Sequence, residues 1–283
     1  MNRKWWLVLS LLLLQGCSAI KLGYQQLPTL SYWWLDSAVD FDDAQAIASK
    51  DALSRLHNWH RKNELVTYAD WLGRNAQASQ GDVDSAQVCQ EWTEVQSGMA
   101  RLMKQTLALV TPVAQQLGPR QINHLALHFE AKNEDWEKEW LQGSSSERLK
   151  RRLDKLLARY NDFYGELTPS QVTMVRQHLE QSAWSPEWGR QDRQRRQQDL
   201  LASLQRISQS QMTPAQAESL LAGVGQRWLM PKDAAGKEMM PSMARQACNN
   251  LAQLHNTTSP EQRQRVARRI KAYERDLRSL ALP

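Results

Sequence analysis

The spacing of apolar residues along the chain predicts long amphipathic helices. One stripe near the end steps by four and three residues, and it consists of Val266, Ile270, Tyr273, Leu277 and Leu280. A similar stripe begins at Leu149 and ends at Leu167. Such steps place the apolar side chains on one face of a helix. No segment shows sustained alternation of apolar and polar residues between hairpin turns, so a sheet is not expected. The pattern predicts an all-α protein.

The same pattern divides the chain into ten predicted helices. They cover residues 24–38, 43–74, 85–116, 120–142, 146–165, 169–181, 186–209, 214–229, 241–255 and 260–280. Residues 230–241 contain Gly236 and two prolines, so we predict a loop there. The expected architecture is an elongated multi-helix bundle or a stack of helical hairpins.

A short phrase recurs where helices are expected to begin. Residues 168–171, 213–216 and 259–262 each read as a hydroxyl residue, proline, any residue and glutamine. This is a capping box, in which the hydroxyl and the glutamine satisfy orphan backbone amides, with proline at the first helical position. Residues 42–45 and 84–87 carry aspartate as the cap, and residues 118–121 are a weaker version with glycine. The intervening segments are dissimilar, so the phrase is a reused start signal rather than a solenoid repeat.

The amino end has the pattern of a bacterial export signal. Arg3 and Lys4 precede an uncharged run over residues 5–14, which is too short for a bilayer span of about 20 residues. Gly16 stands directly before Cys17, and residues 14–17 resemble the lipobox of bacterial lipoproteins. This resemblance implies cleavage between Gly16 and Cys17 and lipidation of Cys17. An ordinary signal peptide with an incidental cysteine is the alternative.

The lipobox resemblance implies a domain organisation and a location. Residues 1–16 would be the signal peptide, residues 17–40 the lipidated start with a tether or first helix, and residues 41–283 one helical periplasmic domain. Three acyl chains on one cysteine exceed the threshold for stable anchoring, so the chain would be anchored to a membrane and not threaded through it. Serine follows the cysteine, where inner-membrane lipoproteins typically carry aspartate. We therefore expect the periplasmic face of the outer membrane.

Export changes how the other cysteines are interpreted. Cys89 and Cys248 remain once Cys17 is lipidated. Disulfides persist in the periplasm, and two cysteines allow one intramolecular pairing. We predict a disulfide between Cys89 and Cys248, with two buried thiols as the alternative.

Candidate chemistry is sparse. The sequence has no nucleophile elbow and no phosphate-cradling glycine loop. His57, His60 and Glu64 share a helical face and are the candidates for acid and base work, although the same spacing is typical of a solvated face. His124 and His128 also share a face, but two histidines leave a metal site short of ligands, so neither a metal nor a cofactor is expected.

Aromatic residues and net charge bear on possible partners. Most tryptophans have apolar neighbours at helical spacing and are expected to anchor the core: Trp59, Trp71, Trp92, Trp136, Trp140, Trp184, Trp188 and Trp228. Residues 32–35 follow Cys17 closely and fit either the core, which we favour, or a membrane surface. The net charge of +6 permits attraction to anionic headgroups. Nucleic acid is not an expected partner because it conflicts with export.

Several motifs together resemble a family of proteobacterial lipoproteins known only as a domain of unknown function. They are residues 14–17, 32–36, 56–61, 64–65, 87–89, 193–201 and the set Phe129, Asn133, Trp136, Glu139 and Trp140. This resemblance covers essentially the whole chain and implies an exported helical lipoprotein without an assigned activity. Residues 167–171 and 212–216 are also weakly similar to the Leu-Thr-x-x-Gln motif of Spy-type periplasmic chaperones.

These features favour a non-enzymatic protein of the cell envelope that acts by binding. It would be an envelope scaffold or a holdase, with the membrane, envelope proteins or unfolded clients as partners. The alternative is an enzyme that acts on peptidoglycan or lipid through dispersed histidines and glutamates, of which His57, His60 and Glu64 are the candidates.

Overall fold

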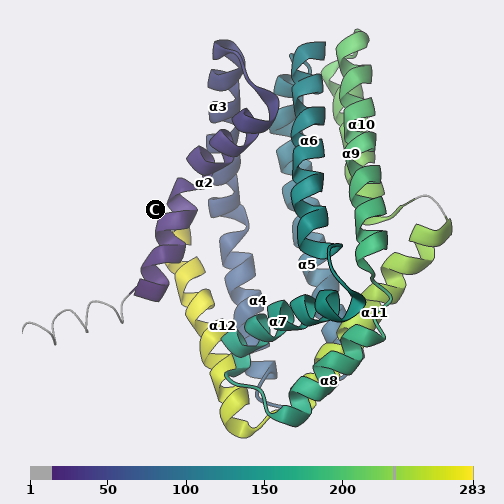
Figure 1. The fold of residues 1–283 in the computed structure, drawn as a ribbon. Coiled ribbons are helices and arrows are strands. Elements are labelled where there is room, and N and C mark those ends of the chain that lie inside the picture. Colours follow the sequence, from purple (N-terminus) through teal and green to yellow (C-terminus); the bar gives the residue numbers. More distant parts are fainter. Residues whose placement is uncertain (1–14, 232–233, 283) are drawn as a thin grey trace, which may run out of the picture.

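The fold consists of helices, as the sequence predicts (Figure 1). We analysed a computed structural model that describes residues 15–231 and 234–282, so most of the expected signal peptide, residues 1–14, lies outside the described residues. The first helices are α2 (Gln15–Val39), α3 (Asp43–Asn63), α4 (Leu65–Ala78), α5 (Ser85–Ala114), α6 (Pro119–Trp140) and α7 (Ser145–Tyr164). The remaining helices are α8 (Pro169–Glu180), α9 (Pro186–Gln209), α10 (Pro214–Leu229), α11 (Ala234–Asn256) and α12 (Pro260–Ala281). Within the described ranges there is no strand, which confirms the all-α prediction.

The helices begin at the predicted capping boxes. Asp42, Asp84, Thr168, Thr213 and Ser259 each accept a hydrogen bond from the backbone amide of the glutamine three residues later. Each glutamine side chain in turn accepts from the backbone amide of its cap residue. At α6 the glycine cap offers no side chain, and only the second bond forms, from the Gly118 amide to Gln121 at 3.0 Å. Local sequence therefore sets most helix starts.

Four of these glutamines also join helix starts that are far apart in sequence. The amides of Gln45 (α3) and Gln121 (α6) hydrogen-bond to each other in both directions. Gln171 (α8) and Gln262 (α12) do the same, at 3.0 and 3.1 Å. In every case the amide also donates to the carbonyl two residues before the partner's cap, on Gln116, Asp40, Thr257 and Glu166. We call these two arrangements the upper and the lower glutamine junction, from their places in Figure 1.

The buried apolar side chains form two separate clusters. The upper cluster draws on α2, α5, α6, α9 and α10, and includes Val39, Leu107, Ile122, Leu204 and Leu221. The lower cluster draws on α7, α8, α11 and α12, with Leu167 just before α8, and includes Leu153, Val175, Leu254 and Val266. Figure 1 shows the long, roughly parallel helices α5, α6, α9 and α10 above, and α7, α8 and α11 crossing below them. α5 also contacts α11 and α3, so it extends from one region to the other.

Three predicted boundaries are wrong. The helix expected over residues 24–38 begins at Gln15. The single helix expected over residues 43–74 is divided at Glu64, which separates α3 from α4 and turns its carboxylate towards Arg101 of α5. The loop expected over residues 230–241 is also wrong beyond residue 233, because α11 begins at Ala234 and passes through Gly236 and Pro241. Proline is tolerated within a helix when tertiary packing outweighs the missing hydrogen bond, and α11 packs on α5 and α8.

The cysteines pair as predicted. The sulfurs of Cys89 on α5 and Cys248 on α11 are 2.08 Å apart, with their Cα atoms at 5.4 Å. This bond joins positions separated by 159 residues. It fastens α11 to the long central helix beside the lower cluster.

Candidate functional site

The three predicted site residues lie around Tyr24, at the place where α2 crosses α3. His57 Nε2 donates to the carbonyl oxygen of Tyr24 at 3.1 Å, and the Tyr24 hydroxyl is hydrogen-bonded to His60 Nδ1 at 2.9 Å. The Tyr24 ring also packs on the His57 ring with centroids 4.6 Å apart. Both histidines therefore hold α2 in place.

Glu64 occupies the far side of this cluster and forms an ion pair in which its carboxylate is buried and the Arg101 side chain is 46% exposed. Its two carboxylate oxygens accept from Arg101 Nε and Nη2 at 2.9 and 2.8 Å, a bidentate geometry. Tyr68 lies against Gly98, where an added Cβ would come within 3.1 Å of the tyrosine ring. A larger residue at this position of α5 would therefore have to displace the Tyr68 ring. The pair ties the break between α3 and α4 to α5.

Burial and hydrogen bonding set the charge states of the cluster. Burial lowers the pKa of His57 and of His60 below 6.5. Burial raises the pKa of Tyr24 and of Tyr68 to about 12. The hydrogen bonds from Arg101 lower the pKa of Glu64. Near neutral pH the cluster therefore contains neutral imidazoles, neutral phenols and one carboxylate neutralised by arginine.

This geometry favours a structural joint over acid and base chemistry. A general base must reach the proton of a bound substrate, and both oxygens of Glu64 are taken by Arg101. The ring nitrogens of His57 and His60 that make hydrogen bonds do so with Tyr24 of α2. The structure therefore brings the three predicted residues together, but it places them within an interhelical network.

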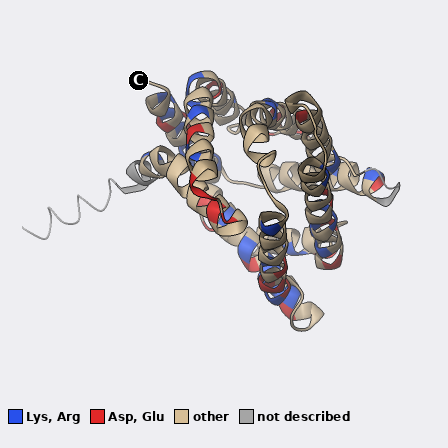
Figure 2. Cartoon of the chain, turned by 90° about the horizontal axis from the view of Figure 1, so that it is seen from above, with Lys and Arg blue, Asp and Glu red and all other residues tan. Residues whose placement is uncertain are grey.

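The end of α12 is fastened to the same joint. Arg61 Nε donates to the carbonyl oxygen of Leu280 at 2.7 Å. Lys21 Nζ donates to Ser279 Oγ at 3.0 Å and lies 3.8 Å from the buried carboxylate of Asp276. As a result, α2 and the C-terminal end of α12 lie side by side, as Figures 1 and 2 show by the position of the C marker.

A second polar cluster between α6 and α9 was not predicted as a site. Arg193 Nε donates to Asn133 Oδ1 at 2.6 Å, and Asn133 exchanges hydrogen bonds with Gln197 at 2.8 and 3.0 Å. These residues appear among the motifs that resemble the lipoprotein family. Their separation of about 60 residues carries no local signal of contact, so sequence spacing alone could not place them together.

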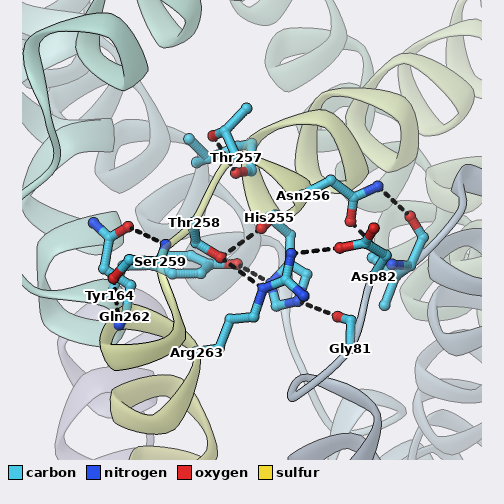
Figure 3. A network of polar contacts seen from close by, with 12 residues as sticks. Gly81, Asp82, Tyr164, His255, Asn256, Thr257, Thr258, Ser259, Gln262 and Arg263 are labelled. Atoms are coloured by element: carbon cyan, nitrogen blue, oxygen red, sulfur yellow. Dashed lines mark hydrogen bonds and ion pairs between the residues drawn. The ribbon is translucent and has the colours of Figure 1, made fainter.

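A third network surrounds His255 at the end of α11 (Figure 3). His255 Nε2 donates to the carbonyl oxygen of Gly81 at 3.0 Å, and His255 Nδ1 is bonded to the Tyr164 hydroxyl at 3.1 Å. Arg263 pairs with Asp82 at 2.5 Å. Asn256 bonds both backbone polar groups of Val83. The turn between α4 and α5 is thereby held to the turn between α11 and α12.

One of the two histidines that share a face of α6 contacts the end of α2. His124 Nε2 bonds the carbonyl oxygen of Ser37 at 3.2 Å. Among residues 15–231 and 234–282, no group of three or more histidine, cysteine, aspartate or glutamate side chains is placed to hold a metal ion.

α2 carries the largest departure from the predicted core. The residues that face away from its neighbours are Leu22, Leu27, Leu30, Trp33 and Trp34, which are 62, 44, 47, 62 and 62% exposed. Our preference for a core location of residues 32–35 is therefore wrong for Trp33 and Trp34, whereas Tyr32 packs near Phe41. Trp92, expected in the core, is 44% exposed as well, and the other seven predicted anchors are half-buried.

None of the helices in the described part of the chain has the length and hydropathy needed to cross a bilayer. The exposed fractions of its side chains place the apolar face of α2 on the surface of the molecule. Cys17 lies in the first turn of that helix.

A comparison with protein-family models matches residues 37–233 to a family of unknown function, DUF6279. The matched range includes His57, His60, Glu64 and Cys89 and ends before Cys248. No curated protein and no solved structure matches the chain.

Proposed function

The chain belongs to DUF6279, a family of unknown function, and we propose that it is a lipid-anchored, non-enzymatic protein of the bacterial envelope that acts by binding and rests α2 on the membrane surface. The exposed apolar face of α2 carries this proposal. It supplies three exposed leucines and two exposed tryptophans on the helix that has Cys17 in its first turn.

The apolar face of α2 lies on the same helix as Cys17, the expected site of lipidation. Lipid on Cys17 would bring the first turn of α2 to the bilayer, and the apolar side chains continue along the same helix. Tryptophan rings prefer the headgroup zone, and an amphipathic helix can lie in the interface with its apolar face buried. A lipid anchor plus an interfacial helix supplies two attachment signals.

The candidate catalytic residues favour binding over catalysis. Glu64 is neutralised by Arg101, and His57 and His60 bond to Tyr24. These contacts hold α2, α3, α4 and α5 together, so a structural role accounts for the three residues. An enzyme on an envelope substrate remains the competing proposal, and alanine at His57, His60 and Glu64 would separate the two. Loss of a cellular phenotype without loss of thermal stability would favour the enzyme.

Vesicle binding by unlipidated protein tests the membrane proposal. A chain that begins at Ser18 retains every residue of both apolar clusters, and it retains the contacts of Lys21 and Tyr24 that fasten α2 to α12 and α3. We expect this chain to sediment with phosphatidylcholine vesicles and its tryptophan emission to shift to shorter wavelength. Burying each exposed indole contributes roughly 2 kcal/mol, so W33S/W34S should weaken binding on the order of 100-fold or more.

Trp92→Ser is the matched control, since Trp92 is also exposed but lies on α5. It should leave vesicle binding unchanged. No binding by the parent chain, or equal losses in the control and in W33S/W34S, would remove the membrane role of α2.

A holdase is the second candidate, because exposed apolar side chains also lie outside α2. Ile47, Leu127 and Met99 are 71, 56 and 46% exposed. Light scattering from a reduced, aggregating client protein would test this, with the chain from Ser18 added at substoichiometric and equimolar ratios. Suppression of scattering would support the holdase, and no effect would leave the scaffold, with partner capture by cross-linking in cells as the next step.

A further inference from the structure

α12 carries two kinds of basic side chain. On the sides that contact α7 and the region of α4, three arginines have an acidic partner. Arg263 pairs with Asp82 at 2.5 Å, Arg269 with Asp162 at 4.0 Å, and Arg278 with Asp70 at 2.8 Å. These pairs neutralise three of the arginines of α12.

A different face of α12 has cations without such partners. Arg268, Lys271 and Arg275 step by three and four residues and are exposed on one stripe. In the described part of the chain none of the three lies within ion-pair distance of a carboxylate. Like charges at these spacings repel each other and destabilise a helix. A bound anion would remove that repulsion.

The three cations line a groove. Its volume is about 400 Å³, and Gln80, Gln264 and the nearly buried Ala267 complete the lining. Arginine binds phosphate oxygens with two parallel N–H groups, and lysine supplies a compact point charge. The glutamine amides are suited to hydroxyl groups beside the phosphate. The methylene stems and Ala267 supply an apolar floor.

We propose that this groove binds the phosphate headgroup of an acidic phospholipid. The inference rests on the proposed membrane role of α2 and names the class of lipid that the protein selects. Lys21 of α2 contacts Ser279 and Asp276, so the two surfaces belong to neighbouring elements at one side of the molecule (Figures 1 and 2). α2 supplies the apolar contact, and α12 supplies the charge complementarity.

The test compares two kinds of vesicle, phosphatidylcholine alone and phosphatidylcholine mixed with phosphatidylglycerol, with the chain that begins at Ser18. A cation near an anionic surface contributes about 5-fold in affinity, so three contribute on the order of 100-fold. We expect R268Q/K271Q/R275Q to lose this gain on phosphatidylglycerol and to bind phosphatidylcholine like the parent chain. Lys271→Gln and Arg275→Gln alone should each lose about 5-fold.

The matched control, K104Q/R176Q/R206Q, removes three exposed cations that lie on α5, α8 and α9 and have no acidic partner in the described part of the chain. It has the same net charge as the groove variant and should keep the preference for phosphatidylglycerol. Equal losses in the two triple variants would mean diffuse attraction and would overturn the groove. Circular dichroism melts confirm that each variant is folded.

Inorganic phosphate is the second probe. Phosphate should displace the parent chain from phosphatidylglycerol vesicles more strongly than sodium chloride at equal ionic strength. Equal displacement by the two salts would contradict a phosphate site.

The outcomes separate the two proposals, since W33S/W34S lowers binding to both kinds of vesicle. If the parent chain does not bind phosphatidylcholine but the groove variant still loses binding to phosphatidylglycerol, the membrane role of α2 is contradicted and the groove proposal is supported.

Discussion

The upper and lower regions of the molecule are closed by the same device but are stabilised differently. Each has a glutamine junction in which two helix starts meet. The upper cluster buries ten apolar residues and contains no disulfide, whereas the lower cluster buries six and lies beside Cys89–Cys248 and the His255 network. The lower region therefore gains from cross-links what it lacks in buried apolar area. Small cores commonly need such additions.

The largest expected effect comes from the disulfide. The variant C89A/C248A should lose about 2–5 kcal/mol of unfolding free energy, because the bond restricts a long loop in the unfolded chain. Urea denaturation measures this loss. Hydrogen exchange should then show that amides of α7, α8 and α11 lose more protection than those of α6 and α9. Equal loss in both sets would contradict the division into two regions.

The two glutamine junctions should be equally important despite their different surroundings. Gln45→Ala and Gln171→Ala each leave a cap amide, a distant carbonyl and a partner amide without their hydrogen bonds. We expect each variant to lose about 2–3 kcal/mol in urea denaturation, since an unsatisfied buried polar group costs about 1–3 kcal/mol. A loss confined to Gln45→Ala would show that only the upper junction bears on stability.

Acidification should affect the lower region through His255. Burial lowers the pKa of this imidazole below 6.5; the hydrogen bond to Gly81 and the charge of Asp82 oppose this shift, and Arg263 adds to it. As the pH falls below 6.5 the unfolded chain binds a proton first, so stability decreases by at most about 1.4 kcal/mol per pH unit until the folded pKa is reached. Burial lowers the pKa of His57 and His60 as well, so these two histidines also make the fold less stable as the pH falls.

His255→Gln isolates the contribution of the lower network. Its unfolding free energy, measured by urea between pH 7.5 and 5, should have a shallower dependence on pH than that of the parent chain. An unchanged slope would assign the acid sensitivity to His57 and His60 alone.

The smallest effect is expected at the capping box of α10, whose glutamine is not part of a glutamine junction. Gln216 is exposed and bonds only within its own helix start. Gln216→Ala should cost about 0.5–1 kcal/mol, the value of a cap. A loss as large as that of Gln171→Ala would mean that the junctions add nothing to capping.

Local signals made much of this fold predictable. The capping boxes predicted helix starts because their hydrogen bonds lie within four residues, and the expectation of export led to the Cys89–Cys248 pairing. The meeting of Gln45 with Gln121 was not predictable, since a capping phrase does not specify which other helix start it contacts. The break at Glu64 was missed because neither glycine nor proline marks it, and a contact with Arg101 on a distant helix accounts for it.

The candidate site shows the same limit. Spacing placed His57, His60 and Glu64 on one face, but the contact with Tyr24 depends on where α2 lies. The tryptophans of residues 32–35 fitted either interior or surface by composition, and only the orientation of α2 on α3 and α6 exposes Trp33 and Trp34.

The contact of Lys21 with Ser279 has a practical consequence for the design of fusions. An affinity tag or fluorescent protein joined after α12 would emerge beside α2, where it would compete for the surface that we assign to the bilayer. The turn between α6 and α7, around exposed Gly143 and Ser144, is the better place for an insertion. Conversely, the neighbouring ends make the fold suited to circular permutation, with a short linker from α12 to α2 and new ends in that turn.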